Sequence, residues 1–344
     1  METRSMKDKK NYSDEHRIAY KKLAVLGVLF IFLLVSIILS ISLGATTISL
    51  EKIAQALFVE REGLTYNIIK NIRMPRTFVG MLVGICLALS GAILQGVMRN
   101  SLASPNIIGV SSGAGLAATI CLVLIPEYAY LTPIAAFAGA FITTILIYLL
   151  SYKNGIRPLR MVLAGVAVSS LVNAIINLIL IFFPDRVQDT LGFTIGTLNM
   201  ALWSDFRLLL PYALVGLVLC FLFARKMNVL MLGDEIASSL GVNVERSRFF
   251  FIALASLLAA SSVSVVGLLG FVGLIVPHIV KLLIGSDYRY VYVGSTFLGG
   301  AIVIFCDTVA RVVLAPMEIP VGITMAILGV PFFLYLLRGR IAHD

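Results

Sequence analysis

Apolar runs long enough to cross a bilayer recur along the chain from Leu23 to Leu337, and short polar stretches separate them. A helix that spans the hydrocarbon core needs about 20 mostly apolar residues. The pattern predicts about ten such helices, so we expect an all-α polytopic membrane protein. The predicted spans fall at residues 23–44, 75–97, 105–125, 130–151, 160–183, 206–225, 247–268, 271–285, 289–313 and 320–338.

The same pattern gives the domain organisation. Residues 23–338 are expected to form one transmembrane domain, with an N-terminal tail at 1–22 and a C-terminal tail at 339–344. The polar stretches between the spans are too short to hold a separate soluble domain. The run at 23–44 follows a long polar lead and precedes no convincing cleavage site, so we expect a retained first span rather than a signal peptide.

The predicted span at 271–285 is short and broken. The segment Gly270-Phe-Val-Gly-Leu-Ile-Val-Pro-His278 places two glycines, a proline and a histidine in an apolar run. A membrane helix tolerates such breaks only where protein or trapped water satisfies the freed backbone groups. We therefore expect this segment to be a moving part or a pathway wall rather than an anchor.

The composition narrows the class of protein. The chain is 59% hydrophobic and 13% charged, whereas soluble domains carry nearly twice that share of charge. The net charge of +9 therefore concerns membrane topology, and no nucleic-acid partner is expected. The four cysteines lie in apolar runs without a CxxC pair, which predicts no disulfide framework, metal site or cofactor. These cysteines are Cys86, Cys121, Cys220 and Cys306.

The placement of positive charge orients the predicted helices. With ten spans and the N-terminus inside, 19 of the 27 lysines and arginines fall on the inner side. Cytoplasmic loops of membrane proteins carry such an excess. Both termini are therefore expected in the cytoplasm, with the chain in a bacterial plasma membrane, and an odd number of spans would destroy the balance.

Charged residues near the predicted outer surface are candidates for a binding role. Arg73 and Arg76 lie three residues apart before the second span, and Asp307 and Arg311 lie four apart on the ninth, so each pair shares a helix face. An acidic partner outside the membrane would explain the outer arginines, because arginine forms forked pairs with carboxylates. There are simpler explanations. Snorkelling to the membrane interface would explain Arg73 and Arg76, and a purely structural ion pair would explain Asp307. Arg311 is expected near the outer end of its helix, where its head could reach the outer surface.

A short amphipathic helix is predicted between the sixth and seventh spans, on the cytoplasmic side. In Gly233-Asp-Glu-Ile-Ala-Ser-Ser-Leu-Gly241 the two acids suit a first helical turn and the last glycine suits a helix end. Ile236 and Leu240 lie on its other face. A solvated loop needs no apolar stripe, so we expect a helix that docks on a partner.

Two other classes of function deserve weighing. An ion-coupled secondary transporter or a channel would act without an ATPase, but such carriers usually hold charged side chains at mid-membrane, and this chain has few. An intramembrane serine hydrolase is suggested by Gly109-Val-Ser-Ser-Gly113 with His278, but the expected strand and turn are missing. His278 is a lone histidine and predicts no metal site. The chain has no G-x-x-x-x-G-K-[ST] motif, so any ATP must bind to another subunit.

Several short sequence blocks follow one another in a fixed order between residues 70 and 337. They are Arg73-Met-Pro-Arg76, Ser90-Gly-Ala-Ile-Leu-Gln95, Arg99-Asn100 with Leu102-Ala103 and Pro105, Ile108-Gly-Val-Ser-Ser-Gly-Ala114, Leu163-Ala-Gly-Val166, Leu232-Gly-Asp-Glu235 with Leu240-Gly-Val242, Gly270 to His278, Asp307 with Arg311, Glu318-Ile-Pro-Val-Gly322, and Gly329-Val-Pro-Phe-Phe333. In these blocks the chain resembles the FecCD family, the permease subunits of ABC importers for iron–siderophore complexes, haem and cobalamin. The resemblance implies a type II ABC importer permease fold with ten helices per subunit.

The resemblance implies a transport subunit rather than an enzyme. It implies a homodimer, or a heterodimer with a related permease, with the pathway at the dimer axis. Two copies of an ATPase subunit would lie beneath it and an extracytoplasmic substrate-binding protein above it, with membrane lipid around it. Iron–siderophore uptake is the expected function, while haem and cobalamin stay open as substrates.

The resemblance also implies roles for individual residues. Arg73, Arg76 and Arg311 match outward arginines that, in the cobalamin member, pair with glutamates of the binding protein. Asn100 and Leu102 match a cytoplasmic gate loop. The chain departs from the family pattern at Ser101, Ser104 and Lys281, which affects the expected stiffness of the gate. The matching coupling helix for the ATPase contains Gly233, Asp234, Glu235, Ala237, Leu240 and Gly241.

Overall fold

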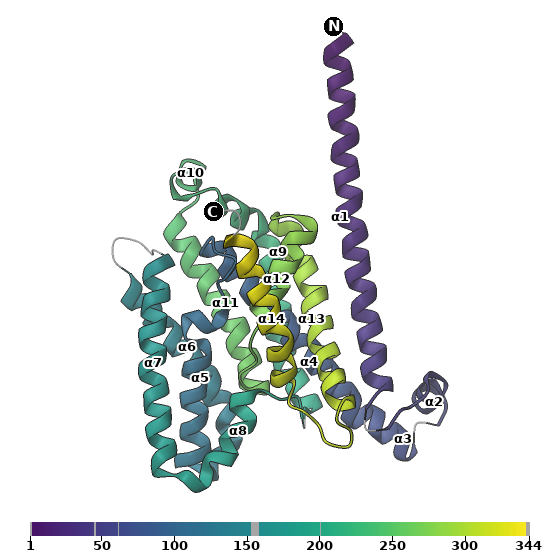
Figure 1. The fold of residues 1–344 in the computed structure, drawn as a ribbon, viewed down its shortest axis with the longest axis vertical. Helices are drawn as coiled ribbons and strands as arrows, with labels where there is room; N and C mark the ends of the chain where they lie inside the picture. Colours follow the sequence, from purple (N-terminus) through teal and green to yellow (C-terminus); the bar gives the residue numbers. More distant parts are fainter. Residues whose placement is uncertain (1, 45, 61, 153–157, 200, 342–344) are drawn as a thin grey trace.

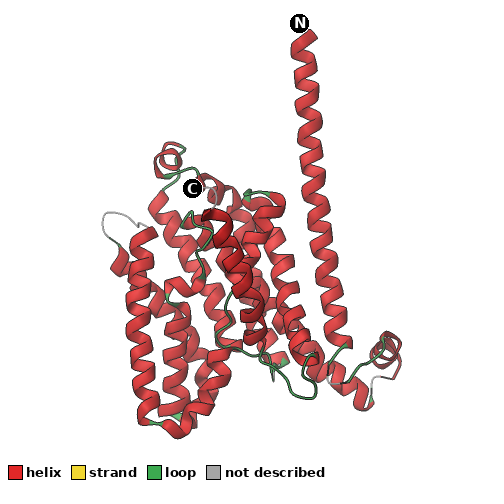
Figure 2. Cartoon of the chain, viewed as in Figure 1, coloured by secondary structure: helices red, strands yellow, loops and turns green. Residues whose placement is uncertain are grey.

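The computed structural model of the chain describes residues 2–44, 46–60, 62–152, 158–199 and 201–341. This described part consists of helices and loops, without a β-strand (Figure 2). Met1 and the last three residues of the predicted C-terminal tail lie outside the described residues. Ten of the helices coincide with the predicted spans: α1 (Glu2–Ser42), α4 (Met74–Val97), α5 (Val110–Thr119), α6 (Thr132–Ser151), α7 (Pro158–Phe182), α9 (Trp203–Met231), α11 (Val244–Val266), α12 (Val272–Ile284), α13 (Tyr288–Val312) and α14 (Val321–Ile341).

The helices differ in their capacity to cross a membrane. Seven described helices are long and apolar enough to span it by length and composition. The stretches Val110–Leu124, Val272–Ile284 and Val321–Leu334 form shorter apolar helices. The prediction of an all-α membrane protein is confirmed, and the broken span expected at 271–285 is the 13-residue helix α12.

α4 is the central helix of the bundle, and it packs against α9, α11, α12 and α13. Two of its glycines permit the close approach. A Cβ added at Gly84 would lie 2.1 Å from the carbonyl oxygen of Gly299 in α13. A Cβ added at Gly91 would lie 1.8 Å from the carbonyl oxygen of Gly273 in α12. Small residues at such crossings let membrane helices pack by van der Waals contact, since lipid supplies no hydrophobic drive between them.

The predicted span at 105–125 is not one helix. Pro105–Ile108 forms a short 3₁₀ turn, and Gly109 then adopts a left-handed backbone with φ of +76° before α5 begins. The proline and the glycine are the sequence signals of this break, because proline starts a helical segment well and glycine tolerates positive φ.

The loop between α11 and α12 also breaks the helical pattern. Its Leu268 N–H donates to the carbonyl oxygen of Phe193, at 2.8 Å. Phe193 belongs to α8 (Val187–Ile195), a short helix that the apolar pattern did not predict. Protein groups therefore satisfy this part of the interrupted backbone, as expected for the segment that begins near Gly270.

The two ends of the bundle carry different elements (Figure 1). The start of α1, the end of α14 and the short helix α10 (Asp234–Ser239) lie at one end, which we call the α10 end. α2 (Leu50–Gln55) and α3 (Gly63–Asn67) lie at the opposite end, the α2/α3 end. Both ends of the described chain thus lie on one side of the bundle, as an even number of spans requires.

Candidate docking, coupling and gate sites

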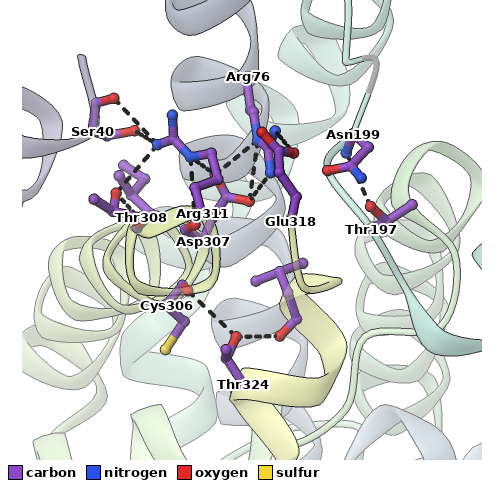
Figure 3. A network of polar contacts seen from close by, with 12 residues as sticks. Ser40, Arg76, Thr197, Asn199, Cys306, Asp307, Thr308, Arg311, Glu318 and Thr324 are labelled. Atoms are coloured by element: carbon purple, nitrogen blue, oxygen red, sulfur yellow. Dashed lines mark hydrogen bonds and ion pairs between the residues drawn. The ribbon is translucent and has the colours of Figure 1, made fainter. Parts of the chain in front are cut away.

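Charged side chains from α4, α13 and the loop before α14 meet at the α2/α3 end (Figure 3). The carboxylate of Asp307 accepts hydrogen bonds from Nε and Nη2 of Arg76, at 2.9 and 2.8 Å. It also pairs with Nε of Arg311 at 3.1 Å. Nη1 of Arg76 lies 2.7 Å from a carboxylate oxygen of Glu318. The predicted Asp307–Arg311 ion pair is confirmed, whereas sequence reasoning missed its extension to Arg76 and Glu318.

These charges are held away from solvent. The side chain of Asp307 is 2% exposed, and those of Arg76 and Arg311 are also buried. A buried charge is costly unless it is paired and hydrogen-bonded, and the carboxylate of Asp307 contacts both guanidinium groups. Glu318 is the more exposed of the two acids and pairs directly with Arg76.

The same end of the bundle holds the C-terminal end of α1. Nη1 of Arg73 donates to the carbonyl oxygens of Ile41 and Ser42, both at 2.8 Å, and Nη2 of Arg311 donates to Ser40 Oγ at 2.8 Å. The last carbonyls of a helix lack intrahelical partners and carry partial negative charge, so cations stabilise them. We call Arg73, Arg76, Asp307, Arg311 and Glu318 the arginine network.

The sequence would allow the head of Arg311 to reach the outer surface, but the structure buries it. Arg311 is 4% exposed, and Arg73 and Arg76 are buried as well. Their donors face carbonyl and carboxylate oxygens of the same chain. The forked arginine–carboxylate contact that the sequence suggested does occur at Arg76, but its partner Asp307 lies within the chain.

α10 lies at the opposite end and is shorter than predicted. It covers Asp234–Ser239, and the flanking glycines Gly233 and Gly241 have φ of +118° and +80°. Ala237 is fully buried and anchors the helix to the bundle. Glu235 is exposed, and the neighbouring apolar side chains Leu232, Ile236 and Leu240 are exposed by 56, 50 and 59%. The predicted apolar stripe therefore faces outward.

The gate-loop residues lie in a tight turn between α4 and Pro105. Asn100 Oδ1 accepts a hydrogen bond from the N–H of Leu102 at 2.9 Å. Arg99, next to them, has a left-handed backbone with φ of +48° and forms an ion pair with Asp234 of α10. The structure thus brings the candidate gate turn and the candidate coupling helix into direct contact, through an arginine whose role the local sequence pattern does not indicate.

The arrangement of the remaining candidate groups does not resemble a hydrolase site. Ser111 Oγ donates to Asn106 Oδ1 at 2.5 Å, and the hydroxyls of Ser112 and Ser169 lie 3.0 Å apart. The ring of His278 stands edge-on to Phe332, with ring centroids 6.5 Å apart. Within the described residues no group of three His, Cys, Asp or Glu side chains could hold a metal ion.

A model of the FecCD transport family matches residues 32–339 of the chain. The chain belongs to the FecCD transport family. This FecCD permease is 39% identical over 320 residues to the Fe(3+)-citrate import system permease protein YfmE of Bacillus subtilis, with 92% of this chain and 95% of that protein covered. It is 43% identical over 274 residues to the cobalamin import system permease protein BtuC of Halobacterium salinarum, with 79 and 74% covered.

The fold of the FecCD permease is also found in solved structures. A metal-chelate type ABC transporter in an inward-facing conformation superimposes with a TM-score of 0.83 at 27% identity, covering 92% of this chain and 99% of the other. The prediction of the ABC importer permease fold is therefore confirmed.

Membership of the family decides between the classes of function. The FecCD permease is an integral membrane transport subunit of an ABC importer, and ATP hydrolysis belongs to a separate ATPase subunit. An importer of this kind also works with a substrate-binding protein. Neither a carrier that acts without an ATPase nor an intramembrane hydrolase agrees with this family.

Proposed function

We propose that this FecCD permease forms the path by which a ferric siderophore or a similar iron chelate enters the bacterial cytoplasm. Its similarity to the Fe(3+)-citrate permease over 92% of the chain supports iron chelates as the substrate class. The cobalamin permease of Halobacterium is 43% identical but matches a smaller share of the chain, 79%. Cobalamin and haem are therefore the competing substrates that an uptake assay must include.

The observation that carries the mechanism is the exposed apolar surface of α10. Leu232, Ile236 and Leu240 lie in or next to α10, which Ala237 anchors to the bundle. Apolar side chains left exposed together outside the membrane favour burial by a partner. We assign this surface to a cleft of the ATPase, so that ATP-driven closure of two ATPase subunits displaces α10. The α10 end and both chain termini then lie in the cytoplasm.

The exposed face of α7 supports a second permease subunit at the pathway. Only 11% of the most apolar 18-residue stretch of α7 is buried within the chain. Ser170, Asn173 and Asn177 are exposed on one side of this helix, and their spacing places them on one face. Polar side chains on a spanning helix are costly in lipid and usually face protein or a water-filled path. We propose that this face borders the path shared with a second copy, or with a related permease.

Reconstituted vesicles test this function through Leu240→Asp. Vesicles that hold the permease, its ATPase and the binding protein are expected to accumulate the iron chelate only with ATP, and the purified complex is expected to have the mass of two permeases with two ATPases. Leu240 is exposed, so the variant should fold. Its carboxylate would be buried in the ATPase cleft, and we expect uptake and ATPase co-purification to fall about tenfold or more.

Leu64→Asp is the matched control, because Leu64 is 78% exposed at the opposite end, in α3. This variant should keep its ATPase. Equal loss in both variants, or none in Leu240→Asp, would contradict the place of the coupling surface. Uphill uptake by vesicles without ATPase would contradict the whole function. Uptake of haem or cobalamin in place of the ferric chelate would contradict the substrate class alone.

We further propose that the arginine network contributes to docking of the binding protein, as the family resemblance implies for Arg73, Arg76 and Arg311. Its position at the α2/α3 end, opposite α10, supports this role. Reversing all three charges is a poor test, because it would bury unpaired acids beside Asp307. Arg73 is the better probe, since its guanidinium group donates to backbone and hydroxyl oxygens at the end of α1 and just after it, and not to carboxylates.

Arg73→Gln is expected to weaken binding of the substrate-loaded binding protein about tenfold, because a positive charge close to the proposed docking surface is lost. Lys52→Gln is the control: it removes an exposed cation of α2 at the same end. Arg73→Lys should restore part of the affinity. Binding would be measured by surface plasmon resonance on detergent-purified complex, with thermal unfolding as the check on folding. If Arg73→Gln and Lys52→Gln weaken binding equally, the lost affinity reflects the general positive charge of this end, and the specific role of Arg73 is contradicted.

A further inference from the structure

One carboxylate joins three segments at the α10 end. Asp234, the first residue of α10, forms ion pairs with Arg99 in the turn after α4 and with Arg248 in α11, the latter at 2.8 Å. The side chain of Arg248 is 7% exposed, whereas that of Arg99 is 36% exposed. Arg248 thus holds Asp234 to the packed bundle, and Arg99 links it to the turn with the candidate gate residues.

Hydrogen bonds make that turn a unit. The N–H of Asn100 donates to the carbonyl oxygen of Gln95, and the N–H of Ala103 donates to the carbonyl oxygen of Asn100, both at 3.1 Å. Asn100 Oδ1 accepts from the N–H of Leu102. Arg99 directly precedes Asn100, so the side chain that contacts Asp234 belongs to the residue next to this hydrogen-bonded turn.

The backbone on both sides of the contact is unusual. Arg99 has φ of +48°, a left-handed conformation that disfavours residues with a side chain. Gly233, beside Asp234, has φ of +118°, and a Cβ added there would lie 3.8 Å from Nη1 of Arg99. The left-handed Arg99 closes the C-terminal end of α4, since its N–H donates to the carbonyl oxygen of Gly96 at 3.2 Å and the N–H of Asn100 donates to that of Gln95. The turn therefore starts at a capped helix end, and the partly exposed ion pair of Arg99 with Asp234 contributes little to stability.

We propose that Arg99 is a positioning residue that carries the movement of α10 to the gate turn through Asp234. The inference rests on the proposed function, in which the ATPase contacts α10. When ATPase closure displaces α10, Asp234 draws Arg99 with it, and the hydrogen-bonded turn of Asn100 and Leu102 follows. Arg248 keeps the carboxylate attached to α11 during this movement.

A thiol in the gate turn reports this movement. The Oγ atom of Ser101 is buried, and the four native cysteines are buried too. In Ser101→Cys the new thiol should therefore react with a maleimide at a rate that depends on the position of the turn. The rate would be measured on the full complex in vesicles, with and without ATP plus vanadate.

Three variants would be compared on the Ser101→Cys background: Arg99→Gln, Arg99→Lys and Arg289→Gln. Arg289→Gln is the control, because Arg289 forms an exposed ion pair with Asp287 at the same end.

The expected result is a loss of coupling without a loss of assembly. Arg99→Gln should retain its ATPase and hydrolyse ATP, but transport per ATP should fall about tenfold, and labelling should no longer respond to nucleotide. Arg99→Lys should keep part of the response, and Arg289→Gln should behave like the parent.

A normal labelling response and normal uptake in Arg99→Gln would overturn the proposed link between α10 and the gate turn. Loss of the ATPase from Arg99→Gln would also overturn it, because Arg99 would then belong to the docking surface. A parent complex without any nucleotide response or ATP-driven uptake would overturn the proposed function itself.

Discussion

Asp307→Asn is expected to destabilise the folded permease by about 3–5 kcal/mol, since it leaves two buried guanidinium groups with one fewer carboxylate. Asp307 is the acid that contacts both Arg76 and Arg311, and its side chain is 2% exposed. Asparagine keeps the shape but not the charge, so packing stays nearly unchanged while the ion pairs are lost. The effect would be measured as the apparent melting temperature and the yield of monodisperse protein in detergent.

Two further variants isolate the electrostatic cause. Asp185→Asn removes an exposed acid in the turn after α7 and should leave the melting temperature unchanged. Arg311→Leu added to Asp307→Asn should recover part of the loss, because Arg76 retains its contact with Glu318 while the unpaired charge of Arg311 is removed. If Asp307→Asn melts like the parent, the network contributes no stability and the structural role given to Asp307 is wrong.

Gly91→Ala is expected to prevent correct packing of α4 on α12. The added Cβ would lie 1.8 Å from the carbonyl oxygen of Gly273, and a backbone oxygen cannot rotate away as a side chain can. Overpacking typically costs about 1–3 kcal/mol, and a backbone clash at the central helix should reach the upper part of that range or exceed it. The measurement is again the melting temperature and the folded yield, with uptake of the surviving protein.

Gly27→Ala provides the control of opposite sign. Nothing lies within 4 Å of a Cβ added at Gly27 in α1. Alanine favours a helix over glycine by about 1 kcal/mol, so this variant should be neutral or slightly more stable. A Gly91→Ala protein as stable as Gly27→Ala would mean that α4 and α12 do not approach as closely as the structure has them.

Much of the fold could be predicted because membrane helices follow from local patterns. Apolar length located the ten helices, and the i, i+4 spacing of Asp307 and Arg311 predicted their contact. The acids and glycines around residue 234 located α10, although they overstated its length. These signals lie within one helix or one turn, so they need no knowledge of the tertiary arrangement.

The arrangement of the arginines could not be predicted in this way. Arg76 and Asp307 are separated by 231 residues, and only the packing of α13 on α4 brings them together. From sequence, an arginine at a helix entrance suits water, a lipid headgroup or a carboxylate equally well. The contact of Arg99 with Asp234 spans 135 residues and escapes local patterns for the same reason.

The arginine network contains three cations, Arg73, Arg76 and Arg311, and two anions, Asp307 and Glu318. It is therefore one negative charge short of neutrality while the permease stands alone. A glutamate or aspartate brought to this end by another protein would complete the balance, and its attraction would weaken as salt is added. If the binding protein docks at the α2/α3 end as proposed, the excess positive charge of the network would favour an acidic surface on that protein.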